Sequence, residues 1–138
     1  MQRNTSRRAM CGGIAVAVLV WWGPAWAGSY LNRAALLILE SRAEADILRK
    51  HLSDQELARV VLEICEGRLE AARGMFVPPE VRLAHPHLVI MLERYALAAD
   101  AAVRGKPENF LSIEREARDE EQIFRSIVKQ LGWDLPNL

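Results

Sequence analysis

The sequence has only two cysteines, Cys11 and Cys65, among its 138 residues. If the first 27 residues are removed, Cys65 is left alone and no disulfide can form within the chain. A lone cysteine outside the cytoplasm either pairs with another chain or lies buried as a small apolar residue, and we expect Cys65 to be buried. No Cys-x-x-Cys-His motif is present, so a c-type haem attachment site is excluded.

The common catalytic signatures are also missing. The sequence has no glycine-rich phosphate loop, no His-Glu-x-x-His, no Gly-x-Ser-x-Gly and no pair of Glu-x-x-His motifs such as ferritin-like bundles use to hold iron. It therefore predicts no catalytic residue, no cofactor and no enzymatic activity. The acidic run Asp119-Glu120-Glu121 is most simply a solvated helix face.

Acidic residues are absent from the first 27 positions, where the charges are Arg3, Arg7 and Arg8. The stretch from Ala9 to Trp22 is uncharged, and Ala25-Trp26-Ala27 has the small-x-small pattern that a leader peptidase needs. A positive region, an apolar region and a cleavage site in this order predict a signal peptide over residues 1–27. Cleavage after Ala27 would leave a periplasmic or secreted chain that begins at Gly28.

Two alternatives stay open for this leader. Residues 9–27 carry no charge, and about 20 such residues can span a bilayer, so the segment could instead remain as a membrane anchor. Ser6-Arg7-Arg8 resembles a twin-arginine signal, but Met10 and Cys11 are a poor version of the hydrophobic pair that should follow, and we expect Sec export. By either route the arginines stay in the cytoplasm and the domain lies outside.

The remaining segment, residues 28–138, has the length of one domain. Removal of the three leader arginines from the 18 Lys and Arg leaves 15 against 18 Asp and Glu, a net charge of −3. Nucleic acids and anionic membranes call for a basic face, so neither is an expected partner of this domain.

Apolar residues at helical spacing predict four helices, over residues 30–51, 54–73, 86–104 and 107–131. Ser29 is the expected cap of the first, and Ser53-Asp54-Gln55-Glu56 has the capping-box pattern for the second. Gly74, Gly105 and Gly132 follow the ends of the later three. The inward-facing residues expected in the second helix are Leu57, Val61, Ile64, Ala72 and Met75, and those expected in the fourth are Phe110, Ile113, Ala117, Phe124, Ile127 and Leu131.

No run has the alternation of a β-strand, so the predicted fold class is all-α. Short links after the first and third helices predict two antiparallel hairpins, which the proline-bearing segment 76–85 joins. An antiparallel up-down four-helix bundle is the economical arrangement. The third helix is apolar nearly all round, so it either sits deep or shows a second face to a partner, and a homodimer through this helix is one expectation.

His85 and His87 flank Pro86 at the start of the third helix, and Met91 lies one turn after His87. His and Met at positions i and i+4 can hold copper, or a haem iron when a second axial group faces them. The fourth helix has no histidine or methionine to supply that second group. The simpler interpretation is that His85 caps its helix and His87 is a surface or packing residue.

Polar residues also interrupt the apolar stripes of the four helices, at Ser41, Arg68, Arg94 and Glu120. Tight antiparallel hairpins would place them at one height, and a buried arginine needs a carboxylate partner. The positions predict a buried polar layer in which Arg68 approaches Glu120, Arg94 shares the carboxylate and Glu121 lies on the surface. Such a layer either fixes the helix register or lines a pocket for a small anionic ligand, unless Arg68 simply reaches water near its helix end.

Taken together, these patterns predict an exported helical-bundle protein that acts by binding, to a protein partner or to itself, and not by catalysis. The alternative is a periplasmic metal- or haem-carrying bundle that uses His87 and Met91.

Overall fold

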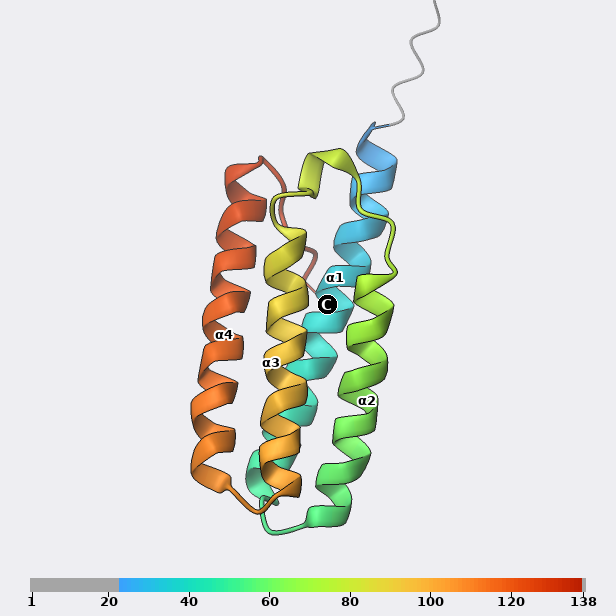
Figure 1. Ribbon diagram of the computed structural model, residues 1–138. Helices are drawn as coiled ribbons and strands as arrows, with labels where there is room; N and C mark the ends of the chain where they lie inside the picture. The colour runs from blue at the N-terminus through green and yellow to red at the C-terminus, as the bar shows by residue number, and fades with distance from the viewer. Residues whose placement is uncertain (1–22, 138) are drawn as a thin grey trace, which may run out of the picture.

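The chain forms four long helices and one short 3-10 turn, with no strand in the part that the structure describes (Figure 1). The computed structural model describes residues 23–137. The helices are α1 (Gly23–Lys50), α2 (Gln55–Arg73), α3 (His85–Val103) and α4 (Pro107–Gln130), and the turn η1 (Pro79–Val81) lies between α2 and α3. The predicted all-α class with four helices is confirmed. None of the helices described is long and apolar enough to cross a membrane.

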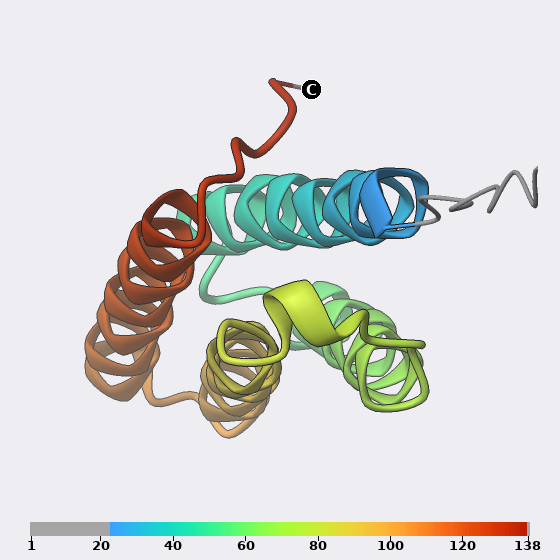
Figure 2. The ribbon, with the colours of Figure 1, turned by 90° about the horizontal axis from the view of Figure 1, so that it is seen from above.

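Successive helices run in opposite directions (Figure 1). The central helix is α3, which packs along α2 on one side and along α4 on the other. Seen from above, α1 lies across the open side of this three-helix layer (Figure 2). It touches α4 over a shorter stretch than it touches α2 or α3. Long side chains therefore have room between α1 and α4.

The central place of α3 explains its apolar composition. Its neighbours α2, α4 and α1 cover different sides of it, so the apolar surface that suggested a partner is largely covered from within the chain. Leu97 is the exposed large apolar residue on this helix. The buried residues of α3 are Leu88, Met91, Leu92, Tyr95, Ala96, Ala98, Ala99, Ala101 and Ala102. The homodimer through this helix stays a prediction.

Local interactions fix the helix ends. Asp54 caps α2: its backbone is extended, and its carboxylate accepts a hydrogen bond from the Leu57 amide at 2.9 Å. The capping box had pointed to Ser53, which instead belongs to the turn before the cap. Gly105 and Gly132 follow α3 and α4 with φ of 68° and 86°, a left-handed conformation that a residue with a Cβ rarely adopts.

The first helix begins earlier than predicted. The expected cap Ser29 lies inside α1, which starts at Gly23. Ala27 and Tyr30 have no exposed surface, so this first part of α1 is packed against the rest of the molecule. The position expected to be cleaved, after Ala27, therefore lies within a helix. Most of the predicted signal peptide, residues 1–22, lies outside the described residues, and its cleavage stays a prediction.

Two predicted helix faces are turned relative to the observed ones. In α2, Ile64 is 42% exposed, because this helix packs against both α3 and α1 and its buried arc includes small residues instead. The buried residues of α2 are Ala58, Val61, Cys65, Arg68, Leu69 and Ala72, which confirms the expected burial of Cys65. In α4 they are Phe110, Glu114, Ala117, Glu121, Phe124 and Val128. Their alternating spacing of four and three is the 3.5-residue seam of closely aligned helices.

Candidate functional site

Two buried glutamates of α4 face α1. Glu114 is 1% exposed and Glu121 is 3% exposed, and they lie seven residues apart on the apolar seam of the helix. On α1, Arg42 and Arg49 have the same spacing of seven. Because the two helices are antiparallel, Arg42 pairs with Glu121 and Arg49 pairs with Glu114. Each buried carboxylate thus receives one arginine from across the gap.

Each glutamate also has an arginine four residues later on its own helix. Arg118 donates to Glu114 through Nε at 2.9 Å and through Nη2 at 2.7 Å, and Arg125 donates to Glu121 through Nε at 2.7 Å. Arg118 reaches back to Asp46 on α1 at 2.9 Å. We call this set the charged seam; it consists of Arg42, Asp46, Arg49, Glu114, Arg118, Glu121 and Arg125.

The side chain of Tyr95 on α3 borders the charged seam. It is 2% exposed, and its hydroxyl is buried without a hydrogen-bond partner among the described residues. Burial raises the pKa of this hydroxyl to about 12, and the charges of Arg118, Glu121 and Glu114 act on it. A buried hydroxyl without a partner costs about 1–3 kcal/mol, so Tyr95 is a locally unfavourable element of this interface.

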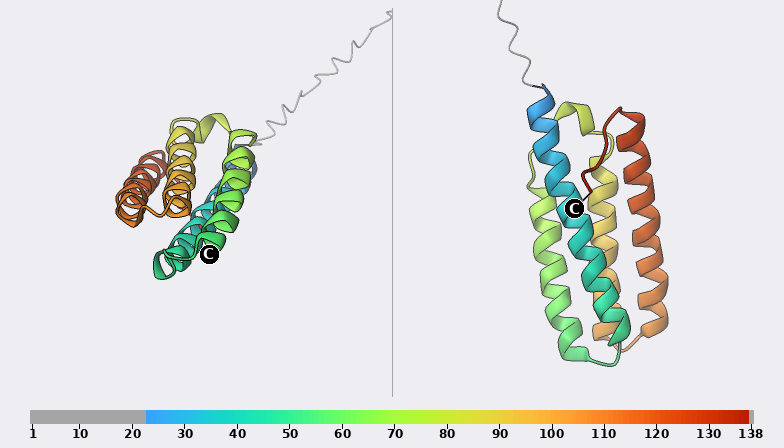
Figure 3. Two further views of the ribbon diagram at one scale, coloured as in Figure 1. Left: turned by 60° about the horizontal axis from the view of Figure 1, so that its bottom comes forward. Right: turned by 180° about the vertical axis from the view of Figure 1, so that it is seen from behind.

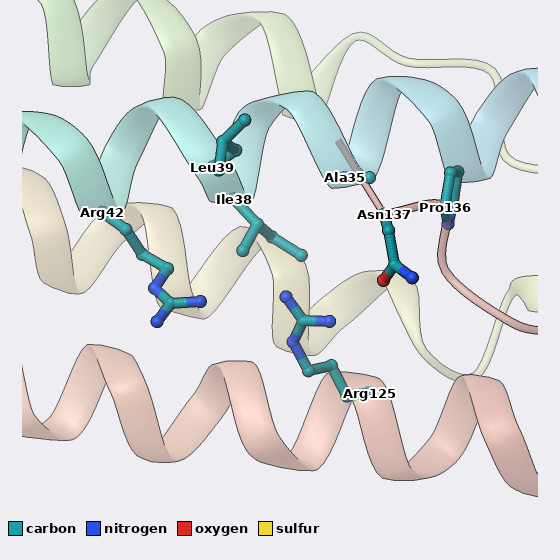
Figure 4. A pocket seen from close by; sticks show the side chains of 7 residues that line it. All are labelled: Ala35, Ile38, Leu39, Arg42, Arg125, Pro136 and Asn137. Carbon is teal, nitrogen blue, oxygen red and sulfur yellow. The ribbon is translucent and has the colours of Figure 1, made fainter.

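A cleft of about 220 Å³ opens between α1 and α4 at the level of Glu121. In Figure 4 the guanidinium groups of Arg42 and Arg125 lie on either side of the gap and the side-chain amide of Asn137 projects into it. The tail after α4 folds back toward α1 and carries Asn137 to this place (Figure 3). The remaining lining residues are Ala35, Ile38, Leu39 and Pro136. The cleft thus combines apolar residues of α1 and of the C-terminal tail with two positive charges, one from Arg42 on α1 and one from Arg125 on α4.

The charged seam has an excess of positive charge. Its four arginines face three carboxylates, those of Asp46, Glu114 and Glu121. A second cleft of about 260 Å³, at the level of Glu114, adds the exposed Arg115 to its lining. One small anion would neutralise the seam.

Comparison with protein-family models, with curated proteins and with solved structures finds nothing similar to this chain. The chemistry of the clefts is therefore argued from their residues alone.

The four residues of the predicted polar layer are not brought together. Ser41 and Arg68 are buried, and Arg68 donates to Ser41 Oγ at 3.3 Å. Its carboxylate partner is Glu44 on α1, with two hydrogen bonds of 2.7 and 2.8 Å. These hydrogen bonds raise the pKa of the guanidinium. Arg68 is thus held by α1 and not by α4.

Glu120 and Arg94 have partners of their own. Glu120 Oε2 lies 2.8 Å from Nδ1 of His87, and Arg94 lies 3.4 Å from Glu116. Glu120 is about a quarter exposed, whereas Glu121 is buried, so the expectation that Glu121 lies on the surface is wrong. The physical reason is the 3.5-residue seam, which turns Glu121 toward α1 and Glu120 toward the start of α3.

The histidines and Met91 are engaged elsewhere in the fold. His85 does not cap α3, whose N-cap is Ala84 without a side-chain hydrogen bond. Its Nδ1 lies 3.0 Å from the Tyr30 hydroxyl. Met91 has no exposed surface. No cluster of three metal-binding side chains of His, Cys, Asp or Glu occurs within residues 23–137.

We expect His85 to make the protein less stable in mild acid. Burial lowers its pKa, against a hydrogen bond with the Ala72 backbone that raises it. The unfolded chain, with a histidine pKa of about 6.5, therefore binds more protons than the folded one just below that pH. The stability that the fold has with a neutral His85 is complete above pH 7 and is lost as the pH falls through 6.5. The free energy of unfolding, measured with urea, should fall less between pH 7 and pH 5.5 in His85→Gln than in the unchanged protein. The control is His51→Gln, at an exposed histidine. Equal losses in all three would contradict this assignment.

Proposed function

We propose that the protein acts outside the cytoplasm as a non-enzymatic binding protein, whose ligand is a small carboxylate with a short alkyl chain. The observation that carries the proposal is the pairing of Arg42 and Arg125 with one buried carboxylate, Glu121, beside apolar residues of the cleft. Both arginine side chains are about two-fifths exposed, and a guanidinium has five N–H donors, more than Glu121 uses, so donors remain for a second carboxylate. Arginine favours carboxylates because its planar donors match two oxygens at once.

The apolar part of the ligand follows from the apolar residues that line the cleft. Ile38, Ala35 and Pro136 offer apolar contacts, and the Asn137 amide can donate to a carboxylate oxygen. Each buried CH₂ group stabilises a complex by about 0.8 kcal/mol, which is roughly a fourfold change in affinity. We therefore expect butyrate to bind more tightly than acetate.

A titration of the full chain with butyrate, followed by NMR, tests the proposal. The Ile38 methyl and Asn137 amide signals should shift, and Arg125→Gln should weaken binding by about tenfold or more, because a hydrogen bond between charged groups contributes about 1.5–3 kcal/mol. The control is Arg59→Gln, an exposed arginine on α2 outside the cleft. Binding that is unchanged in Arg125→Gln, or equal for acetate and butyrate, would contradict the proposal.

Binding of a protein partner is the second candidate. Val60 and Ile64, which are 55% and 42% exposed, lie one turn apart on α2. Gly67 follows on the same face of the helix, and the space around it is open. An exposed apolar strip with a small residue in line suits a helix of a partner or of a second copy. A doubled mass in solution that Ile64→Glu abolishes would favour self-association over the small ligand.

A metal or haem carrier is not proposed, because Met91 is buried in the core and His87 contacts Glu120.

A further inference from the structure

The most exposed apolar side chains gather at one end of the molecule. Leu83 and Phe76, 71% and 60% exposed, are the most exposed of the large apolar residues described, and both lie on the connection between α2 and α3. Trp26 is half exposed on the first turns of α1 and packs edge-on against Phe76, with ring centroids 5.7 Å apart. The start of α1 and this connection lie at the same end (Figure 1). We call Trp26, Phe76 and Leu83 the apolar end.

The chain that precedes α1 joins the molecule at the apolar end. An uncharged stretch runs from Ala9 into the first turn of α1 as far as Trp26, and Arg3, Arg7 and Arg8 come before it. A stretch of about 17–25 uncharged, mainly apolar residues is long enough to cross a bilayer, and flanking basic residues stay on the cytoplasmic side. An anchor of this length would place the apolar end at the outer surface of the membrane.

We propose that the uncharged stretch that begins at Ala9 is retained as a membrane anchor, that Trp26 marks its outer boundary and that the apolar end rests on the lipid surface. Ala27 lies within α1 with no exposed surface, so the residues around the predicted cleavage site are part of the folded domain and contribute to its packing. Tryptophan is enriched at the membrane–water interface, where an amphipathic ring has one apolar and one wet side. The exposed charged residues on the connection are Glu80 and Arg82, one of each sign. The contact is therefore apolar and does not depend on anionic lipid.

Spin labels on the full chain in phosphatidylcholine vesicles test this proposal. Phe76→Cys and Leu83→Cys would be labelled in a Cys11→Ser, Cys65→Ala background. Labels at both positions should relax faster with oxygen, which concentrates in lipid, than with a water-soluble nickel complex. The matched control is Val60→Cys, a comparably exposed apolar position in the second turn of α2, and α2 starts at the opposite end of the molecule (Figure 1). The label there should show the reverse.

Two results would overturn the proposal. One is a label at position 83 that is as accessible to the nickel complex as the label at position 60. The other is an intact mass from the exporting cell that begins at Gly28, because that chain has lost Trp26 and the anchor. Neither result bears on the butyrate titration, since the cleft between α1 and α4 lies away from the apolar end.

Discussion

Replacement of both Arg49 and Arg118 by methionine should lower the free energy of unfolding by about 3–5 kcal/mol. The two arginines are the ion-pair partners of Glu114, whose side chain is 1% exposed. Without them the carboxylate keeps its burial and loses the charges that compensate for it. Urea unfolding at pH 7 with an unchanged m-value measures the loss directly.

The opposite replacement should cost far less. In Glu114→Leu the buried position receives an apolar side chain on a seam that already includes Phe110 and Ala117. The arginines left behind are not stranded, because Arg49 and Arg118 are 45% and 33% exposed and can turn to water. We expect a change of about 1 kcal/mol or less, in either direction, since a buried ion pair is often no more stabilising than an apolar one. A larger loss in Glu114→Leu than in the double variant would contradict this account.

If Glu114→Leu costs little stability, the buried charges between α1 and α4 need another role than stabilising the fold. An apolar α4 would pack against α1 in several registers, whereas Arg42 and Arg49 meet Glu121 and Glu114 in one register only. The excess arginine charge beside Glu121 is then free to bind an anion. Fixing of the register by Glu114 and the proposed binding at Glu121 are separable, because the two levels have different arginines.

Periodicity was enough to predict the helices, since each is a long amphipathic or apolar run with a turn residue at its end. It failed where the buried face of a helix is not its most apolar one. In α4 a period of 3.6 favours Ile113 and Ile127, which are only partly buried. The sequence does show a repeat: Glu114-x-x-x-Arg118 recurs one heptad later as Glu121-x-x-x-Arg125. This repeat marks the face of α4 that is buried against α1.

The partners of buried charges were harder to predict than their burial. Arg68 is predicted to be buried because it interrupts an apolar stripe. Glu120 is predicted as its partner for the same reason, since it interrupts the stripe of α4. Its actual partner, Glu44, stands at the edge of the buried face of α1, where a glutamate looks like any surface residue. The choice depends on which helix lies beside Arg68, and α1 is the neighbour that follows directly from the short link between α1 and α2.

Loss of Glu44 should therefore destabilise the protein much more than loss of Glu120. Glu44→Ala leaves Arg68, whose side chain is 7% exposed, with Ser41 and the more distant Glu40 as its remaining partners. We expect a cost of about 3 kcal/mol, at the lower end for a broken buried pair because Glu40 still compensates in part. Glu120→Ala breaks a pair with His87 in which both side chains reach solvent, and should cost about 1 kcal/mol or less.

A double-mutant cycle separates the ion pair from the packing around it. Arg68→Met in the Glu44→Ala background removes the stranded charge and keeps an unbranched apolar side chain in its place. If the burial of an uncompensated guanidinium is the cause, the double variant should unfold at a higher urea concentration than Glu44→Ala alone. A double variant that is less stable than either single one would show instead that Arg68 acts through its packing. If Glu120→Ala lowers the free energy of unfolding as much as Glu44→Ala does, this account is contradicted. The buried ion pair would then lie between α3 and α4.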